Sequence, residues 1–232
     1  MTFSVGTHKV VAFFFVVLFP LSAKTQTPAP NTTEWENEAL KLRLFYPSDL
    51  VKGDTTQVIS DGRLVLFGVS GASDPKLAEA THCLRPVLLL EQPPSGAAAQ
   101  TPTLTATILL AELDINCLTP DQQSKATHLL ADMAEIVNKV PGMKPIAQPA
   151  TYTIGWQKIH MAAAQGQPQT TNSAPSQLYT MGLSTNWNSH LLVWYFSSNS
   201  IDTLNRITKT TVRFGRDQAA PLYPLTIGNA TP

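Results

Sequence analysis

The stretch HLLVWYFSS, residues 190–198, constrains the fold of this chain more than any other segment. In an extended backbone its apolar side chains fall on both faces, with Leu192, Trp194 and Phe196 on one face and Leu191, Val193 and Tyr195 on the other. A strand of this kind is buried on both sides and lies at the centre of a sheet. We therefore expect a sheet with at least one strand that solvent does not reach.

Six further segments are rich in β-branched and aromatic residues and are mostly bounded by Gly, Pro, Asn, Asp or Ser. They span residues 42–47, 63–70, 84–91, 103–113, 152–163 and 177–187. In the first of them, Leu42, Leu44 and Tyr46 alternate along one face, and Pro47 ends the strand because it has no backbone N–H to donate. The sequence thus predicts seven strands.

Apolar residues at three- and four-residue spacing predict a helix over residues 121–139. Thr119 is its expected N-cap, and Gln122 completes a capping box. A second helix is predicted over residues 201–214 and a short third helix over residues 74–82.

Consecutive strands joined by turn-length loops, with helices interposed only two or three times, favour an antiparallel sheet over a regular alternation of strand and helix. The predicted fold class is α+β, with a predominantly antiparallel sheet of about seven strands and two or three packed helices. The length suits one domain, which we place at residues 40–216, followed by a C-terminal tail at residues 217–232.

Residues 1–23 have the composition of an export signal. The apolar run VVAFFFVVLF is too short to cross a bilayer as a helix, and small residues follow at Ser22 and Ala23. Residues 24–39 are polar and contain proline, which predicts a flexible segment before the domain. We expect cleavage after Ala23, a secreted or periplasmic location and no stable membrane insertion of the mature chain. The alternative is a retained membrane anchor.

The two cysteines, Cys83 and Cys117, flank a predicted hairpin. The strand segments between them are joined by a stretch with Pro and Gly, so folding the hairpin brings the cysteines opposite one another at its open end. We predict a disulfide, which an oxidising compartment permits. The alternative is a redox or metal pair, but the chain has neither a CxxC motif nor a His/Cys ligand cluster.

Several functional classes lack the sequence features that they need. The 16 basic and 16 acidic residues form no basic cluster, whereas nucleic-acid binding requires a concentrated basic face. Without a phosphate loop, a dinucleotide fingerprint or a helical His pair, we expect no cofactor and no metal site. No GxSxG turn marks a nucleophile, so no catalytic residue is assigned. Ser70 or Ser73 with a His leaves open a hydrolase assembled from distant strands.

Four segments together resemble the PsbP-like α/β/α sandwich family. They are an early strand with Phe45, Tyr46 and Pro47, a mid-chain strand with Gly155, an aromatic strand with Trp194, and a terminal segment that ends near Phe214. Members of this family occur in bacterial envelopes and photosynthetic lumens, and they usually act as accessory or binding modules. The resemblance therefore implies a sandwich fold and a non-catalytic role.

Trp187, in the polar segment STNWNSH, has less reason to be buried than the other late aromatic residues. Exposed aromatic side chains are enriched at protein contacts, so Trp187 is the predicted binding residue. Core packing accounts for the others, Trp156 included. The leading hypothesis is an accessory module that docks on an envelope or extracellular protein. The alternatives are the hydrolase and a small-ligand binder with its pocket between sheet and helix.

Overall fold

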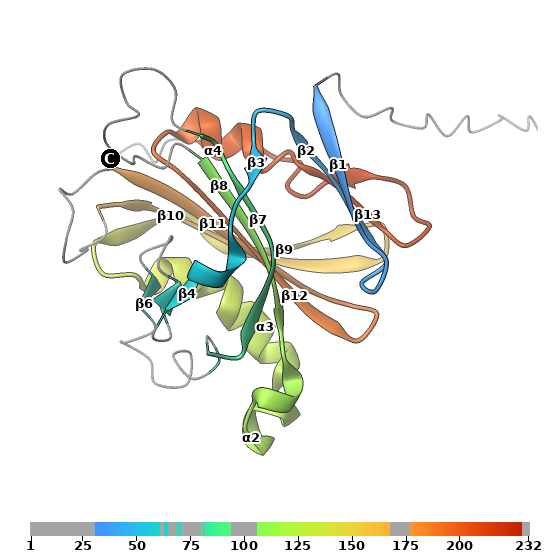
Figure 1. The fold of residues 1–232 in the computed structure, drawn as a ribbon. Coiled ribbons are helices and arrows are strands. Elements are labelled where there is room, and N and C mark those ends of the chain that lie inside the picture. The colour runs from blue at the N-terminus through green and yellow to red at the C-terminus, as the bar shows by residue number, and fades with distance from the viewer. Residues whose placement is uncertain are drawn as a thin grey trace, which may run out of the picture.

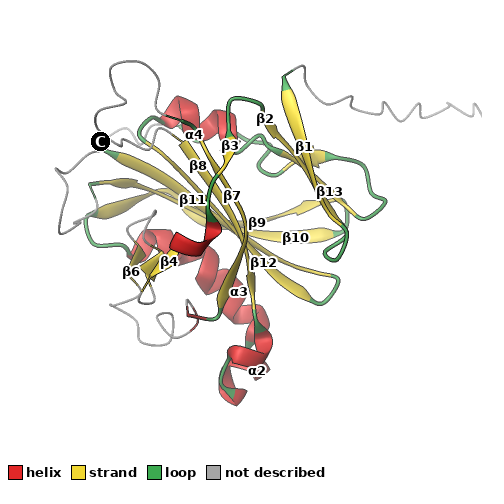
Figure 2. Cartoon of the chain, viewed as in Figure 1, coloured by secondary structure: helices red, strands yellow, loops and turns green. Residues whose placement is uncertain are grey.

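The computed structural model describes residues 31–60, 63–64, 69–70, 80, 82–93, 106–167 and 177–228. Its main feature is a seven-stranded sheet with the order β3-β7-β8-β12-β11-β10-β9, in which all neighbours are antiparallel (Figure 1). These strands are β3 (Val51–Lys52), β7 (Leu84–Glu91), β8 (Ala106–Leu113), β9 (Met143–Ile154), β10 (Gln157–Gly166), β11 (Leu178–Trp187) and β12 (His190–Ser198). The predicted α+β class is confirmed (Figure 2).

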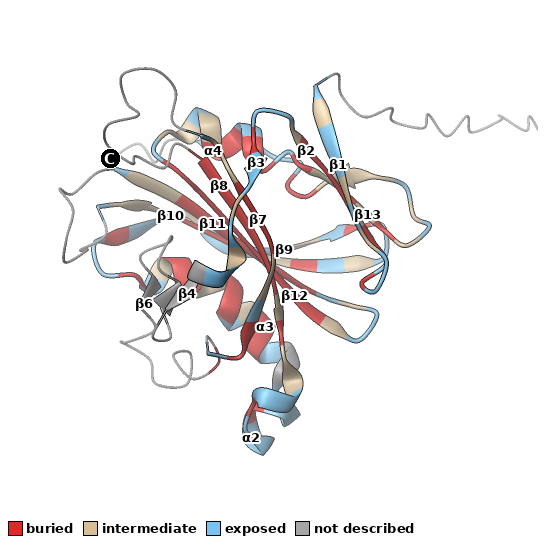
Figure 3. Ribbon diagram, viewed as in Figure 1, coloured by how far each residue is buried: buried red, intermediate tan, exposed pale blue. Residues whose placement is uncertain are grey.

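Strand β12 is the fourth of the seven strands, and both of its faces are buried (Figure 3). Every side chain from Leu191 to Phe196 is at most 3% exposed. The side chains alternate between two apolar clusters, one on each side of the sheet. The prediction of a central strand buried on both sides is therefore confirmed.

One face of the sheet is covered by the helical segment that follows β8. This segment consists of α2 (Pro120–Ser124), α3 (Ala126–Glu135) and the 3-10 helix η6 (Ile136–Lys139), where one helix was predicted. The predicted capping box joins Thr119 and Gln122 at its start. In the described part of the chain, no helix is long and apolar enough to span a membrane.

Two hydroxyl groups on the sheet fasten α3 to it. Ser184 donates to the carbonyl of Leu130, and Tyr195 donates to the carbonyl of Met133 over 2.8 Å. Complete burial raises the pKa of the Tyr195 phenol above its ordinary value, so this group remains a donor at any physiological pH. The helix is thus held by directed bonds as well as by apolar packing.

The opposite face of the main sheet is covered by α4 (Ile201–Ile207) and by a second sheet with the order β1-β2-β13-β14. Its strands are β1 (Thr32–Asn37), β2 (Leu42–Pro47), β13 (Thr211–Phe214) and β14 (Ala220–Pro221). Leu42, Leu44 and Phe214 of this smaller sheet lie in the same apolar cluster as Trp194 of the main sheet. The molecule therefore has three layers, with the seven-stranded sheet in the middle (Figure 1).

Both predicted ends of the domain need correction. Strand β1 falls within residues 24–39, which were predicted to be flexible. Of its residues only Trp35 packs against the core, so the segment shows little apolar periodicity. The predicted tail at residues 217–232 contains β14, and the next two residues, Leu222 and Tyr223, are buried. The folded part therefore extends on both sides of the predicted domain, residues 40–216.

The predicted helix over residues 201–214 is wrong in its second half, because α4 ends at Ile207 and β13 begins four residues later. Thr208 and Thr210 donate their hydroxyls to backbone carbonyls at the end of the helix. Side-chain bonds of this kind compete with the helical pattern, and the β-branched residues that follow favour a strand.

Three other predicted elements differ in extent. The strand predicted over residues 152–163 is divided between β9 and β10 by a turn. The strand predicted over residues 63–70 is described only at its ends, which join a small sheet made of β4 (Ile59–Ser60), β5 (Arg63–Leu64) and β6 (Val69–Ser70). Most of the third predicted helix, and the whole predicted signal peptide, lie outside the described residues.

The two cysteines form a disulfide at the open end of the β7–β8 hairpin. Leu84 pairs with Leu113 at the end of the ladder, which brings the two flanking segments together. Cys117, in the 3-10 helix η5 (Ile115–Cys117), is bonded to Cys83 with 5.5 Å between their Cα atoms. The pairing predicted from the hairpin is confirmed.

Candidate interaction site

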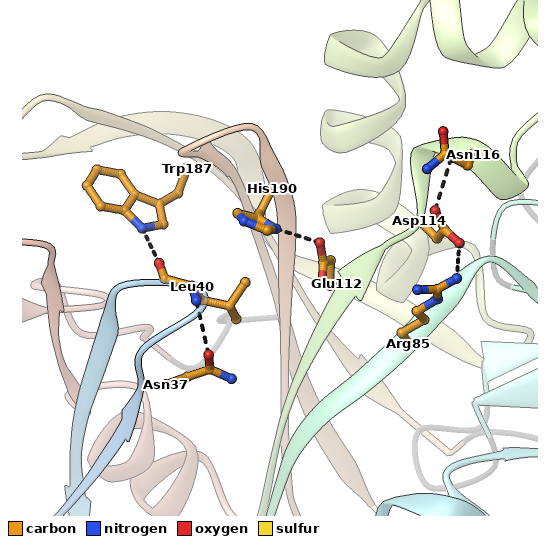
Figure 4. Close-up of polar contacts among 8 residues, drawn as sticks. All are labelled: Asn37, Leu40, Arg85, Glu112, Asp114, Asn116, Trp187 and His190. Carbon is orange, nitrogen blue, oxygen red and sulfur yellow. Dashed lines mark hydrogen bonds and ion pairs between the residues drawn. The ribbon is translucent and has the colours of Figure 1, made fainter.

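Trp187, the predicted binding residue, is the last residue of β11 rather than part of an exposed loop. Its indole is half-buried, and its Nε1–H donates to the carbonyl of Leu40 over 2.7 Å (Figure 4). The ring also lies against Phe214, with 5.2 Å between the ring centroids. Trp187 therefore joins the two sheets, and the expectation that it is an exposed loop aromatic is wrong.

Gly215 shows how closely the chain approaches this indole. A Cβ atom at this position would lie 3.3 Å from two carbon atoms of Trp187, and the residue has a φ of +59°. A side chain would therefore be strained both by its backbone conformation and by its neighbour. The smaller sheet thus packs tightly over the indole.

Trp156 is the exposed tryptophan of the described residues, with 91% of its surface accessible. It occupies the second position of a two-residue turn, since Ile154 pairs with Gln157 across the β9–β10 hairpin. Gly155 precedes it with a φ of +56°, as a type II′ turn requires at its first position. The prediction that Trp156 belongs to the core is wrong. The Gly-Trp pair between two strand-like segments is the signal that would have placed it at a turn.

A hollow of about 550 Å³ lies beside this exposed indole. Ile154 and Phe214, both buried members of the core, contribute apolar surface to its lining. Asp217 and Gln218 add polar groups, and Ala219 and Ala220 complete the wall. A projecting aromatic residue next to an apolar hollow with a polar rim is the arrangement found at the centre of many protein interfaces.

A second concave region, a groove of about 820 Å³, lies between α4 and the adjoining ends of β1 and β2. Two of its walls are joined by an ion pair between Arg206 and Asp49, whose atoms are 2.8 Å apart. Asp49 also accepts a hydrogen bond from Gln92. The amide of Asn205 exchanges two hydrogen bonds, of 2.9 and 2.8 Å, with the backbone of Ile227. The groove is therefore lined by side chains that the fold already holds in place.

The ionisable residues at the end of the main sheet form separate pairs (Figure 4). Nδ1 of His190 lies 2.6 Å from a carboxylate oxygen of Glu112, and Arg85 contacts Asp114. Asp114 also accepts the N–H of Asn116 at the start of η5. Within the described ranges, no three His, Cys, Asp or Glu residues come together in a way that could hold a metal ion. The His190–Glu112 and Arg85–Asp114 pairs instead connect the ends of neighbouring strands of the main sheet.

The remaining hydrolase candidates are not brought together in the described part of the chain. Nδ1 of His160 lies 3.3 Å from the hydroxyl of Thr151 on the neighbouring strand. Burial lowers the pKa of His160, and the positive charge of Lys158 lowers it further. Ser70 ends the short strand β6, and Ser73 lies outside the described residues.

No known protein family matches the chain, and no curated protein matches it. Among solved structures, the chain is similar to cyanobacterial PsbP (CyanoP) from Synechocystis sp. PCC 6803, with a TM-score of 0.39 and 9% identity over 78% of this chain and 87% of that one. It is also similar to PA94 from Pseudomonas aeruginosa, a protein of unknown function, with a TM-score of 0.32 and 11% identity over 72% of this chain and 83% of that one. The first of these solved structures is a PsbP protein, and the PsbP-like family is the one that the sequence resembles.

Proposed function

We propose that this protein is an extracytoplasmic, non-catalytic accessory module that docks on an envelope or extracellular protein through the tip of the β9–β10 hairpin. The single observation that carries the proposal is the exposure of Trp156 beside an apolar hollow. A tryptophan that contributes so little to the core is costly to keep in water, and burial against a partner would recover its apolar surface. The disulfide and the predicted export signal support the proposed location.

The charge distribution supports a partner chosen by shape and apolar contact. The chain has a formal net charge of zero, and the rim of the hollow carries the acidic residue Asp217, which follows the exposed residue Arg216 in the chain. Long-range electrostatic steering is therefore weak, and the interface gains its free energy mainly where the indole is buried.

The test is mild chemical crosslinking in the native host, followed by affinity capture through a tag after Pro232 and identification of the captured protein by mass spectrometry. We expect a discrete crosslinked partner in the extracytoplasmic fraction, and loss of its capture by Trp156→Ala. The matched control is Leu225→Ala, because Leu225 is also a large exposed apolar residue but does not line the hollow. Equal capture by both alanine variants would show that the hairpin tip is not the docking surface.

The second candidate function, binding of a small polar ligand, is favoured by the groove at α4. Its volume lies within the range of ligand sites, and its walls carry hydroxyl, amide and charged groups around Phe45 and Pro47. The test is a thermal-shift screen of sugars and amino acids. We expect any stabilisation to be lost in Arg206→Ala, which opens the wall, and to persist in Trp156→Ala.

A further inference from the structure

The two larger sheets end in four edge strands, and three of these have features that hinder pairing with another strand. β3 and β14 are only two residues long. β9 is long, but it contains Lys144, Pro145 and Pro149 and pairs irregularly with β10. Short length, prolines, lysines and bulges are the usual means by which proteins prevent an edge from recruiting a further strand.

β1 has none of these features. Its six residues pair with β2 in an unbroken register, and they include neither proline nor lysine. The N–H of Ser48 donates to the carbonyl of Asn31 over 3.0 Å, which shows that this pair is a hydrogen-bonded one. Because bonded and non-bonded pairs alternate in an antiparallel ladder, the N–H and C=O groups of Glu34 and Glu36 point away from β2. Within the described residues, β1 is hydrogen-bonded to no strand but β2.

The side chains along this edge are acidic on the outer face of the smaller sheet. Glu34 and Glu36 both contact Arg43, at 3.3 and 2.8 Å, and both remain about half exposed. One guanidinium group between two carboxylates leaves a negative charge at the edge. The next basic residue, Arg213, lies on the far side of Arg43, because the two arginines face each other across β2 and β13. Charge therefore changes from acidic at the edge to basic inside the sheet.

We propose that β1 is a docking edge for an extended segment of a partner protein that carries basic residues at alternate positions with an apolar residue between them. Such a segment adds a fifth strand to the smaller sheet and pairs with the four backbone groups of Glu34 and Glu36 that point away from β2. Its basic side chains lie opposite the two carboxylates, on the same face. The residue between them lies on the other face, beside the half-buried ring of Trp35.

A second copy of the chain is a poor occupant of the same edge. Any antiparallel register that pairs the outward-facing backbone groups of Glu34 and Glu36 with those of the same residues in a second copy places a glutamate opposite a glutamate. Like charges directly opposite each other destabilise a ladder. The acidic pair therefore selects against self-pairing while it attracts a basic strand.

The test uses two short blocked peptides, one of alternating lysine and valine and one of alternating glutamate and valine, with binding to the full chain followed by fluorescence anisotropy at low salt. We expect the lysine peptide to bind roughly tenfold more tightly than the glutamate peptide. Equal binding of the two peptides would overturn the proposal, as would dimerisation through this edge in analytical ultracentrifugation.

Two variants separate the backbone contribution from the charge contribution. Glu34→Pro removes an N–H that faces away from β2, so the variant should fold and should lose binding of the lysine peptide. Glu34→Gln with Glu36→Gln keeps every backbone group, so it should still bind but should no longer distinguish the two peptides. Unchanged binding by Glu34→Pro would show that the edge is not the site. Trp156→Ala should bind the lysine peptide normally, which separates this proposal from docking at the hairpin tip.

Discussion

The two hairpin tips at one end of the main sheet use tryptophan in opposite ways. The β11–β12 hairpin turns through Asn188 and Ser189, both with positive φ, and Trp187 precedes the turn as a strand residue. The β9–β10 hairpin turns through Gly155 and Trp156 themselves. The first indole is hydrogen-bonded to Leu40 and packs against Phe214 with 56° between the ring planes, whereas the second is 91% exposed.

The difference shows that position relative to the turn decides what the side chain does. A strand residue must face one side of its sheet, and Trp187 continues the inward alternation of Met181 and Leu183. A turn residue belongs to neither face, so the fold does not require Trp156 to be buried. The structure thus assigns the first tryptophan to stability and leaves the second available for contact.

The largest expected effect is at the buried tip. Trp187→Ala should lower the free energy of unfolding by about 2 to 4 kcal/mol, because it removes ring contacts and leaves the Leu40 carbonyl without its donor. Urea denaturation measures this change. Trp187→Phe keeps most of the packing and should cost about 1 kcal/mol. If Trp187→Ala lowered the free energy of unfolding by less than about 1 kcal/mol, Trp187 would not be a structural residue and would not differ from Trp156 in this respect.

The next effect concerns the turn that presents Trp156. Gly155→Ala should destabilise the protein by about 1 to 2 kcal/mol, since a φ of +56° is unfavourable for a residue with a Cβ atom. The nearest atom that this Cβ would meet is 3.5 Å away, so the cost is conformational rather than steric. Gly155→Asn should cost less, because asparagine tolerates positive φ better than alanine. Thermal denaturation of the two variants measures the difference.

The sequence predicts the core better than it predicts the tips and edges. The central strand, the capping box at Thr119 and the Cys83–Cys117 pairing rest on strong local signals and are confirmed. The two tryptophans are placed wrongly, because the sequence around each one misleads: Trp187 lies among polar residues, and Trp156 lies inside a segment that was predicted to be one continuous strand. Strand β1 escapes prediction because an edge strand that buries only one large side chain lacks a clear period of two.

A smaller, pH-dependent effect is expected in the exposed hairpin. Burial, and next the charge of Lys158, lower the pKa of His160 in the folded state, so folding favours the neutral imidazole. Its contribution is complete above the ordinary value near pH 6.5 and is lost as the pH falls from there through the folded pKa, because the unfolded chain binds the proton first. His160→Gln should therefore reduce the fall in stability between about pH 7.5 and about pH 5. An equal fall in both proteins would show that another group is responsible.

The smallest expected effect on stability is at Trp156, and it tests directly whether Trp156 differs from Trp187. An indole that is 91% exposed makes few contacts within the fold, so Trp156→Ala should change the free energy of unfolding by no more than about 0.5 kcal/mol. The same variant should lose its partner in the crosslinking experiment, whereas Trp187→Phe should retain it. A destabilisation above about 1 kcal/mol would mean that the Trp156 side chain packs against the chain itself and occupies the hollow beside it. Loss of partner without loss of stability is the result that separates a docking residue from a structural one.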